Sequence, residues 1–280
     1  MTMPFAKYQA LGNSFIVLDE IQQRGRLKRF ESLARAICNP TTGVGADGLL
    51  IVSGITPGLQ VDIYNADGSW AEKSGNGVRI AAMHMLNAGI IAGPSTELLT
   101  GSGISRVTLH GGSPTRRVMS ASLGKPEFAT SRIPMAVPQT FFINQEVTCG
   151  ERTYVASAVS IGNPHLILFC DDFEFDWQSI GRELEVDPLF PRRINVGFVV
   201  VRDADTLEVR DWERGVGPTS SSGTGAAAAL AIAVMRGFTS RIVDVHAPAG
   251  VLRVTWEAAG DEMIIKGPVE FVCAGEFRVS

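Results

Sequence analysis

Two tetrapeptides, Ser74-Gly75-Asn76-Gly77 and Ser222-Gly223-Thr224-Gly225, share one pattern of a hydroxyl residue followed by glycines. Each is followed by small and apolar residues that predict a helix. The copies lie 148 positions apart in a chain of 280 residues, so each half of the chain has one serine at a helix start. Two such side chains acting on one ligand would suit removal of a proton from one side of a carbon atom and its return on the other.

Other stretches repeat in the same order. Gly103–Thr108 recurs as Gly250–Thr255 at an offset of 147, and Gly12-Asn13 recurs as Gly162-Asn163 at an offset of 150. Gly43-Val44-Gly45 has a looser partner in Asn195-Val196-Gly197. The period far exceeds the 20–50 residues of solenoid repeats. The sequence therefore predicts two homologous halves, in preference to glycine turns that match by coincidence.

Composition is that of a globular enzyme. The hydrophobic fraction of 45% and the charged fraction of 19% are ordinary values for two domains of roughly 140 residues. A net charge of −4 argues against nucleic acid as a partner. No uninterrupted apolar stretch reaches about 18 residues, and the first residues lack an apolar signal core. We therefore expect a cytoplasmic protein that binds neither nucleic acid nor a membrane.

The cysteines and histidines predict no metal site. The four cysteines, Cys38, Cys149, Cys170 and Cys273, lack the spacing of metal ligands, and the four histidines are scattered. In a reducing cytosol we expect no disulfide. Cys170 and Cys273 adjoin apolar runs and are predicted to pack in the core.

The pattern of apolar residues predicts an α+β fold. Helices are expected at about residues 29–37, after Gly77 through Leu86, and after Gly225 through Arg236. Short β-branched runs bounded by turn residues predict strands at 15–18, 49–52, 61–64, 107–109, 166–169, 196–201 and 207–212. Turns separate most of these strands, so we expect curved, mostly antiparallel sheets around a helix and not a βαβ sheet. The Pro-rich segment 124–138 is predicted to link the halves.

Six blocks carry a resemblance to a known family. They are Leu11-Gly-Asn-Ser-Phe15, Gly43-Val-Gly-Ala-Asp47, Asn65-Ala-Asp-Gly-Ser69 with Ser74–Gly77, Gly162-Asn-Pro-His165, Asn195-Val-Gly-Phe198 and Glu213-Arg-Gly-Val-Gly217. In this order, over nearly the whole chain, they resemble diaminopimelate epimerase. The resemblance implies two pseudo-symmetric domains, 1–121 plus 269–280 and 122–268, each a sheet around a central helix, with the ligand in the cleft between them. A closing strand near the C-terminus would return to the first domain.

The resemblance also implies an activity. In that family, paired cysteines at two helix N-termini interconvert LL- and meso-diaminopimelate in lysine biosynthesis, without a cofactor and often as homodimers. In this chain Ser74 and Ser222 stand at the two cysteine positions. A thiol has a pKa near 8.5 that a helix N-terminus lowers, whereas a serine hydroxyl needs an adjacent base. Pro218 also departs from the family, which usually has an acidic residue there.

The expected substrate-binding residues are better preserved. By the resemblance, the amino and carboxylate groups of the substrate are recognised by Asn13, Asn65, Asn163, Asn195, Glu213 and Arg214. Arginine offers a bidentate fork to a carboxylate, while glutamate and asparagine oxygens accept from an ammonium group. The amides of Gly75, Asn76, Gly223 and Thr224 are expected to cradle the carboxylate beside the reacting carbon. His165 or Glu213 is a candidate to assist one of the serines.

Each of these residues also has a structural interpretation. Ser74 and Ser222 could be helix N-caps, Asn13 and Asn163 could be turn residues, and Glu213 with Arg214 could form a solvated ion pair. Three functions stay open at this point. The favoured one is an amino-acid isomerase with a serine pair. The others are a different one-base isomerisation on the same scaffold, and a non-catalytic amino-acid binder, including a chain disarmed by Cys→Ser changes.

Overall fold

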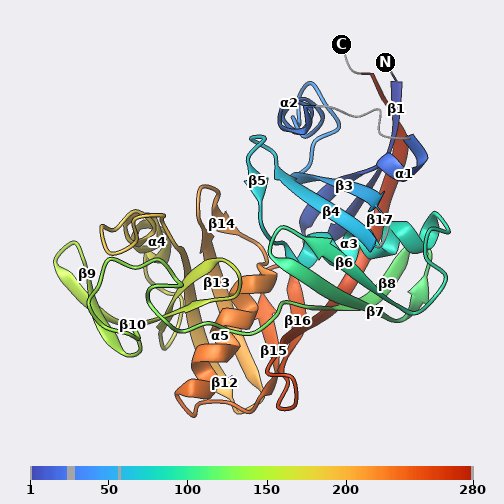
Figure 1. Cartoon of the computed structure of the whole chain (residues 1–280). Coiled ribbons are helices and arrows are strands. Elements are labelled where there is room, and N and C mark those ends of the chain that lie inside the picture. The colour runs from blue at the N-terminus through green and yellow to red at the C-terminus, as the bar shows by residue number, and fades with distance from the viewer. Residues whose placement is uncertain (1, 24–28, 56–57, 279–280) are drawn as a thin grey trace. The chain divides into compact units, whose positions relative to one another are not determined.

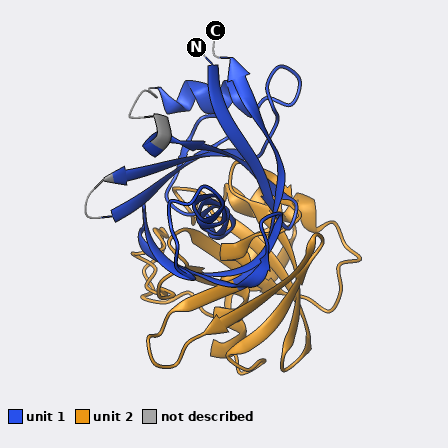
Figure 2. Ribbon diagram, turned by 90° about the vertical axis from the view of Figure 1, so that its right-hand side faces the viewer, with its two compact units in different colours: residues 1–122, 266–280 blue, residues 123–265 orange. Residues whose placement is uncertain are grey.

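The computed structural model describes residues 2–23, 29–55 and 58–278, which form five helices and seventeen strands (Figure 1). The chain divides into two compact units, coloured separately in Figure 2. Unit 1 comprises Met1–Ser122 with Lys266–Ser280, and unit 2 comprises Leu123–Ile265. The boundaries proposed from the sequence lie within three residues of these. The α+β class, with each sheet curved around one helix, is confirmed.

Unit 1 is a strand barrel that closes through the end of the chain. Its strands are β1 (Thr2–Ala10), β2 (Asn13–Asp19), β3 (Gly48–Ile55), β4 (Gly58–Asn65), β5 (Trp70–Ala71), β6 (Ser95–Thr100), β7 (Gly103–Ser113), β8 (Arg116–Ser122) and most of β17 (Met263–Arg278). Consecutive pairings run β1–β2–β3–β4–β6–β7–β8. Strand β17 pairs with both β8 and β1, so it closes the ring. This is the returning C-terminal strand that the resemblance implied.

Unit 2 repeats the same order of pairings. Its strands are β9 (Gln145–Cys149), β10 (Arg152–Ser160), β11 (Pro164–Phe169), β12 (Asn195–Asp203), β13 (Thr206–Glu213), β14 (Gly217–Thr219), β15 (Ile242–Ala247) and β16 (Gly250–Trp256). Strands β10–β11–β12–β13–β15–β16 pair with the same senses as β1–β2–β3–β4–β6–β7: parallel at the second and fourth steps, antiparallel at the others. The two units can therefore be compared residue by residue.

One long helix lies inside each sheet. Helix α3 (Gly75–Asn87) contacts β1, β2, β3, β4, β7 and β8, and Figure 2 shows it end-on within its ring of strands. Helix α5 (Gly223–Met235) contacts β10, β11, β12, β13 and β16. Its first eleven residues are all buried, which explains why the Ala-rich sequence carries no polar face. The sheet can wrap so closely because alanine and glycine keep the helix thin.

Three shorter helices complete the described residues: α1 (Glu20–Gln23), α2 (Phe30–Ile37) and α4 (Trp177–Glu185). The sequence predicted α2, α3 and α5 to within three residues at each end, but it missed α1 and α4. Helix α4 has a mostly polar sequence, and a glycine and a glutamate are two of its three buried residues. All seven predicted strand runs lie inside observed strands, whereas β1, β5, β6, β8–β10 and β14–β16 were not predicted and β17 was implied only by the resemblance.

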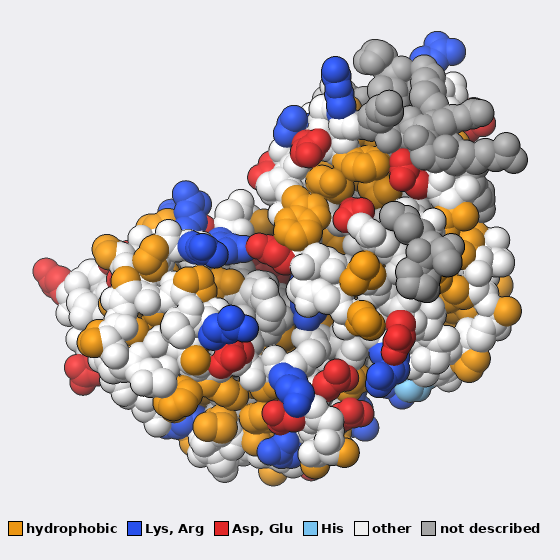
Figure 3. Space-filling view, viewed as in Figure 1, with side chains coloured by type: hydrophobic (Ala, Val, Ile, Leu, Met, Phe, Trp, Pro, Cys, Tyr) orange, Lys and Arg blue, Asp and Glu red, His pale blue; other side chains and the backbone are white. Residues whose placement is uncertain are grey.

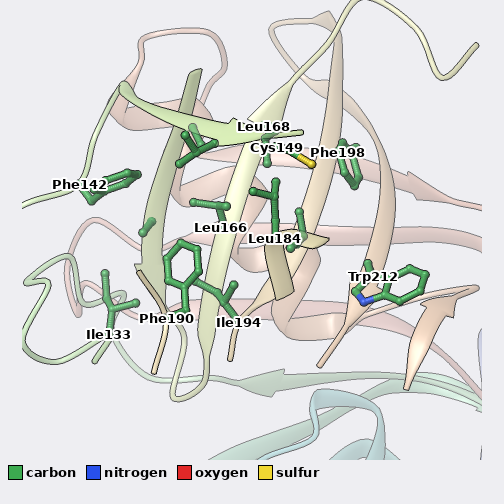
Figure 4. Close-up of a cluster of buried hydrophobic side chains, with 14 residues drawn as sticks. Ile133, Phe142, Cys149, Leu166, Leu168, Leu184, Phe190, Ile194, Phe198 and Trp212 are labelled. Carbon is green, nitrogen blue, oxygen red and sulfur yellow. The ribbon is translucent and has the colours of Figure 1, made fainter. Parts of the chain in front are cut away.

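Segment 124–138 is not a linker. It belongs to unit 2, and Ile133 within it is buried in the main core cluster of that unit (Figure 4). Thr130 is also buried and donates to the carbonyl of Gln139. The prolines mark an irregular chain path that packs onto the sheet, and the sequence alone does not distinguish such a path from a connector.

The proposed match between Gly43-Val44-Gly45 and Asn195-Val196-Gly197 was wrong. Residue pairing places Gly48 opposite Phe15 and Asn195 opposite His165, so Asn195 corresponds to Gly48 and not to Gly43.

Of the two cysteines predicted to pack in the core, one does so. Cys170 packs against the core cluster of unit 2, whereas Cys273 is exposed on β17.

No helix among the described residues is both long and apolar enough to cross a bilayer. On the face drawn in Figure 3, lysine and arginine side chains alternate with acidic ones and form no continuous basic area. The absence of nucleic-acid and membrane partners stays a prediction.

Candidate functional site

The predicted site residues gather at one end of each sheet, around the helix N-terminus. In unit 1, Phe15 near the start of β2 pairs with Gly48 at the start of β3, which pairs with Asn65 at the end of β4. Asn13, at the beginning of β2, is bonded to Asn76 in the first turn of α3. Register and hydrogen bonding thus bring Asn13, Asn65 and Ser74 to the same end of the barrel. Unit 2 does the same with Asn163, Asn195 and Ser222.

Both serines are N-caps, as their structural interpretation anticipated. Ser74 has extended backbone angles, and its Oγ accepts a hydrogen bond of 3.0 Å from the amide of Gly77. Ser222 is the equivalent cap of α5, and its Oγ accepts 3.2 Å from the amide of Gly225. Each cap leaves the hydroxyl hydrogen free to donate elsewhere. Capping and a chemical role are therefore compatible.

The paired turn asparagines hold equivalent positions. Asn76 Nδ2 donates to Asn13 Oδ1 at 3.4 Å, and Asn163 Nδ2 donates to Thr224 Oγ1 at 3.3 Å. In both units, therefore, the asparagine that opens a strand binds the second residue of the central helix. The first helical amides, those of Gly75, Asn76, Gly223 and Thr224, have no acceptor within their own helices and point out of the positive helix end. This arrangement suits an anion.

The second glycine of each tetrapeptide is required by packing. A Cβ on Gly77 would lie 3.1 Å from Ser74 Cβ and 3.2 Å from Leu50 Cδ2. A Cβ on Gly225 would collide with Asp211 Oδ1 and would lie 3.0 Å from Ser222 Cβ. The glycines let the capping serine fold back over the first helical turn.

Unit 2 holds more polar groups around its helix than unit 1. Where unit 1 has Phe15 and Gly48, unit 2 has His165 and Asn195. Asn195 Oδ1 accepts from the amide of Arg214 at 2.9 Å, and its Nδ2 donates to the carbonyl of Pro164 at 2.8 Å. Asn195 therefore ties the Arg214 turn to the start of β11, beside Asn163.

The Glu213–Arg214 turn is held by a buried carboxylate that the sequence analysis missed. Glu185, at the end of α4, accepts 2.7 Å from Trp212 Nε1 and 2.9 Å from the amide of Gly215. The guanidinium of Arg214 donates to the carbonyl of Arg192 at 3.2 Å, and Glu213 accepts from Thr219 Oγ1 at 3.2 Å. Only a correct prediction of α4 could have pointed to Glu185.

Asn65 is placed differently from its predicted partners. Its side chain donates 2.9 Å to Ser69 Oγ and its amide donates to the carbonyl of Ser69, which closes the turn to β5. It lies at the helix end of the barrel, but these bonds are to its own turn. Its predicted role in binding substrate stays untested.

His165 is a weak candidate for assisting a serine. It is buried, and its Nε2 lies 3.0 Å from Asn163 Oδ1, so that nitrogen donates. Burial, with a smaller contribution from Arg214, lowers the pKa of His165 to about 3. The neutral ring orients Asn163 and is too weak a base for proton removal near neutral pH.

Arg79 is a charged residue that the sequence analysis missed. It is fully buried in α3, and its Nη2 donates 2.8 Å to Asn76 Oδ1. Within the described residues, its Nε and Nη1 have no hydrogen-bond partner. Burial lowers its pKa to about 10, so it stays a cation at neutral pH. An arginine directly between Val78 and the apolar run 80–83 was the signal that could have found it.

Three of the four thiols cannot replace the family's cysteine pair. Burial is the main cause that raises the pKa of Cys38 to about 12 and the pKa values of Cys149 and Cys170 to about 11. None of the four cysteines caps the N-terminus of a helix that the structure describes. In the described part of the chain, no three His, Cys, Asp or Glu side chains are grouped to hold a metal ion.

Comparison with known proteins identifies the family. The family model for diaminopimelate epimerase matches residues 5–128 and 157–272. The chain belongs to the diaminopimelate epimerase family. With that family it belongs to the isomerases of the racemase and epimerase type. The chain is 37% identical to the diaminopimelate epimerase of Desulforudis audaxviator, over 98% of this chain and 99% of that protein. It is 35% identical to that of Pelotomaculum thermopropionicum over the same shares.

Solved structures share the fold of this diaminopimelate epimerase family member at much lower identity. A hydroxyproline epimerase from Agrobacterium vitis, solved with bound trans-4-hydroxy-L-proline, matches with a TM-score of 0.74 and 12% identity, over 99% of this chain and 91% of that one. A predicted epimerase from Pseudomonas aeruginosa matches with a TM-score of 0.71 and 15% identity, over 99% and 100%. These likenesses concern the fold alone.

Proposed function

We propose that the protein is an amino-acid isomerase that removes and returns the α-hydrogen of a zwitterionic dicarboxylic amino acid, with diaminopimelate as the expected substrate. The observation that carries this proposal is the equivalent placement of Ser74 and Ser222 as caps of the two central helices. The proposal assigns one serine to each face of the α-carbon. Cytoplasmic lysine biosynthesis and a homodimeric state follow only from the family and belong to the proposal.

The helix ends supply the electrostatics that such a reaction needs. Removing an α-hydrogen places negative charge on the carbon and its carboxylate. The amides of Gly75 and Asn76, or of Gly223 and Thr224, are fixed donors at positive helix ends, so they stabilise that charge without reorganising. Arg79 adds a buried positive charge at the first turn of α3, through its bond to Asn76.

Unit 2 carries the groups suited to the remote end of the substrate. Asn163, Asn195, Glu213 and Arg214 are linked by hydrogen bonds or by adjacency, and Glu185 supports their turn. A carboxylate matches the arginine fork, and an ammonium group matches the glutamate and amide oxygens. The apolar Phe15 and Gly48 at the equivalent places in unit 1 support this asymmetric assignment. The shared order of strand pairings supports an internal duplication followed by this specialisation.

Proton NMR in heavy water tests the proposal. LL- and meso-diaminopimelate are each incubated with the protein, and the α-hydrogen signal is followed. We expect the signal to be lost as deuterium enters, with the other stereoisomer appearing. Unchanged α-hydrogen signals in the presence of a bound ligand would overturn the isomerase proposal and leave a binding function.

Capping variants separate the structural role of the serines from the chemical one. Asparagine caps a helix as well as serine does but has no hydroxyl. We expect Ser74→Asn and Ser222→Asn to keep the melting temperature and to lose α-hydrogen exchange. Ser74→Ala and Ser222→Ala would lose exchange as well as about 1 kcal/mol of stability through the lost cap. Exchange that survives in both asparagine variants would contradict the role of the serines.

Arg214 provides a test of the binding residues. Diaminopimelate at about 100 times its dissociation constant should stabilise the protein by roughly 2.7 kcal/mol, which is measured as a thermal shift. We expect Arg214→Ala to remove that shift. Arg202→Ala is the matched control, because Arg202 is an exposed arginine that pairs with Glu208. An equal shift in Arg214→Ala and the wild type would show that Arg214 does not bind the substrate.

A further inference from the structure

A buried carboxyl group lies beneath Ser222 and has no counterpart in unit 1. Asp211, on β13, is only 5% exposed. Its Oδ1 and Cγ are the atoms nearest to the point where a Cβ on Gly225 would lie, and Ser222 Cβ is 3.0 Å from the same point. Asp211 and Ser222 therefore both pack on Gly225, whose amide Ser222 caps.

A glycine on the neighbouring strand leaves space for this carboxyl group. Asp211 pairs with Gly197 across β12 and β13, and the equivalent pair in unit 1 is Ile63 with Leu50. Leu50 packs against Gly77, so its side chain fills the space beneath the first turn of α3. In unit 2, a Cβ on Gly197 would lie 2.9 Å from Ile167 Cδ1 and 3.5 Å from Asp211 Oδ1, so the glycine leaves room for both of these side chains. The apolar pair Leu50 and Ile63 of unit 1 thus corresponds to Gly197 and Asp211 in unit 2.

The surroundings of Asp211 leave its charge uncompensated. Burial and the nearby charge of Glu213 raise its pKa to about 8, against a smaller opposing effect of Arg210. Among the described residues, no hydrogen bond to the Asp211 carboxyl group is found. A buried acid without a partner costs stability unless it is protonated, so a purely structural role gives no reason for it. Its pKa near the operating pH is that of a general base.

The Ser222 hydroxyl and the Asp211 carboxyl group pack on the same glycine but are not hydrogen-bonded to each other in this structure. We infer that they come into contact when substrate binds, and that Asp211 accepts the proton of the Ser222 hydroxyl while Ser222 removes the α-hydrogen of the substrate. This inference rests on the proposed function, and it supplies the adjacent base that a serine requires. Asp211 does not touch the substrate in this scheme and acts only through Ser222.

The step is balanced. The bond between the α-carbon and its hydrogen breaks, its electron pair stays on the carbon, and the hydrogen forms a bond to Ser222 Oγ. At the same time the original Oγ–H bond breaks, and that proton binds the Asp211 carboxylate. Ser222 ends as a neutral hydroxyl and Asp211 as a neutral acid. Deuterium reaches the substrate when the Ser222 hydroxyl hydrogen exchanges with heavy water before the reverse step, or in a second cycle after a deuteron has passed from Asp211 to Ser222.

Asp211→Asn tests this inference, because it keeps the shape of the side chain and removes the base. For the wild type, we expect the rate of α-hydrogen exchange to rise roughly tenfold per pH unit below about pH 8 and then to level off. We expect Asp211→Asn to lose at least a hundredfold in rate and to lose this rise with pH, while diaminopimelate still shifts its melting temperature.

A thiol should make the base unnecessary. We expect Ser222→Cys to rescue exchange in the Asp211→Asn background, because a thiol ionises without help. A structural defect caused by Asp211→Asn would not be rescued in this way. The double change Gly197→Leu with Asp211→Ile copies the pair of unit 1 and provides a second, apolar variant if Asp211→Asn fails to fold.

Stability gives an independent check of the carboxyl group. An acid whose pKa is higher in the folded protein than in the unfolded chain stabilises the fold at low pH, and this stabilisation is lost as pH rises through the folded pKa. We therefore expect the melting temperature of Asp211→Asn to rise relative to that of the wild type as the pH is increased from about 4 to about 8.

The outcomes are distinguishable. If the wild type exchanges the α-hydrogen and Asp211→Asn does so with the same rate and pH profile, the inference is overturned and the proposed function stays in place. No exchange by the wild type or by the cysteine variants would overturn both.

Discussion

Replacing both serines by cysteine should raise the rate of α-hydrogen exchange on diaminopimelate by a factor on the order of 10²–10⁴, the usual contribution of acid–base catalysis. Ser74 and Ser222 cap helices whose positive ends lower the pKa of a thiol from about 8.5 toward neutral pH. A serine hydroxyl stays protonated in the same place. Proton NMR of the Ser74→Cys, Ser222→Cys double variant in heavy water measures this gain.

Controls make this result specific. Each single cysteine variant should gain less than the double variant, because one face of the carbon still meets a hydroxyl. Ser102→Cys places a thiol on an exposed loop and should leave the rate unchanged. If the double variant gains nothing while binding is kept, the remaining residues have been retuned, and the substrate is a different amino acid.

Gly43→Ala should have a large effect on stability. A Cβ on Gly43 would collide with the carbonyl oxygens of Ala36, Ile37 and Asn39, the last two at 2.6 and 2.9 Å. These are backbone atoms at the end of α2, so they cannot move aside as a side chain can. We expect a loss of about 3 kcal/mol or more, or a fall in melting temperature of at least about 6 °C.

Gly93→Ala is the matched control for this prediction. Gly93 is exposed, and the nearest atom to a Cβ there is the carbonyl oxygen of Ser95 at 3.7 Å, an ordinary contact. Its melting temperature should stay within about 2 °C of the wild type. Equal melting temperatures for the two variants would show that the loop after α2 is not as closely packed as the structure has it.

Several features of the fold follow directly from sequence patterns. The two tetrapeptides predict both central helices and both caps, because a hydroxyl residue before glycines and small apolar residues satisfies the amides of a helix start. Period-two runs of β-branched residues predict the central strands. The C-terminal strand β17 was implied by the resemblance and not by a local pattern, because its partners β1 and β8 are distant in the chain. Helix α4, whose sequence is mostly polar, was missed.

The residues of the candidate site also differ in whether the sequence could predict them. The position of Ser222, Gly223 and Thr224 at a helix start could be predicted because it depends on local helix geometry. Asp211 was missed, although the alternation Leu207, Val209, Asp211 along one strand already pointed it inward. Arg79 and Glu185 were missed because their importance depends on what surrounds them.

The sequence by itself determined the family, the α+β class, the two capped helices and the presence of serines at both helix starts. These properties are local or are repeated along the chain, so nearby residues are enough to specify them. Only the tertiary structure decided that Asp211 lies beneath Ser222, that Gly197 makes room for it, and that Glu185 holds the Arg214 turn. The pKa of a side chain is set by its burial and its charged neighbours, and strand pairing brings those neighbours together from separate parts of the chain.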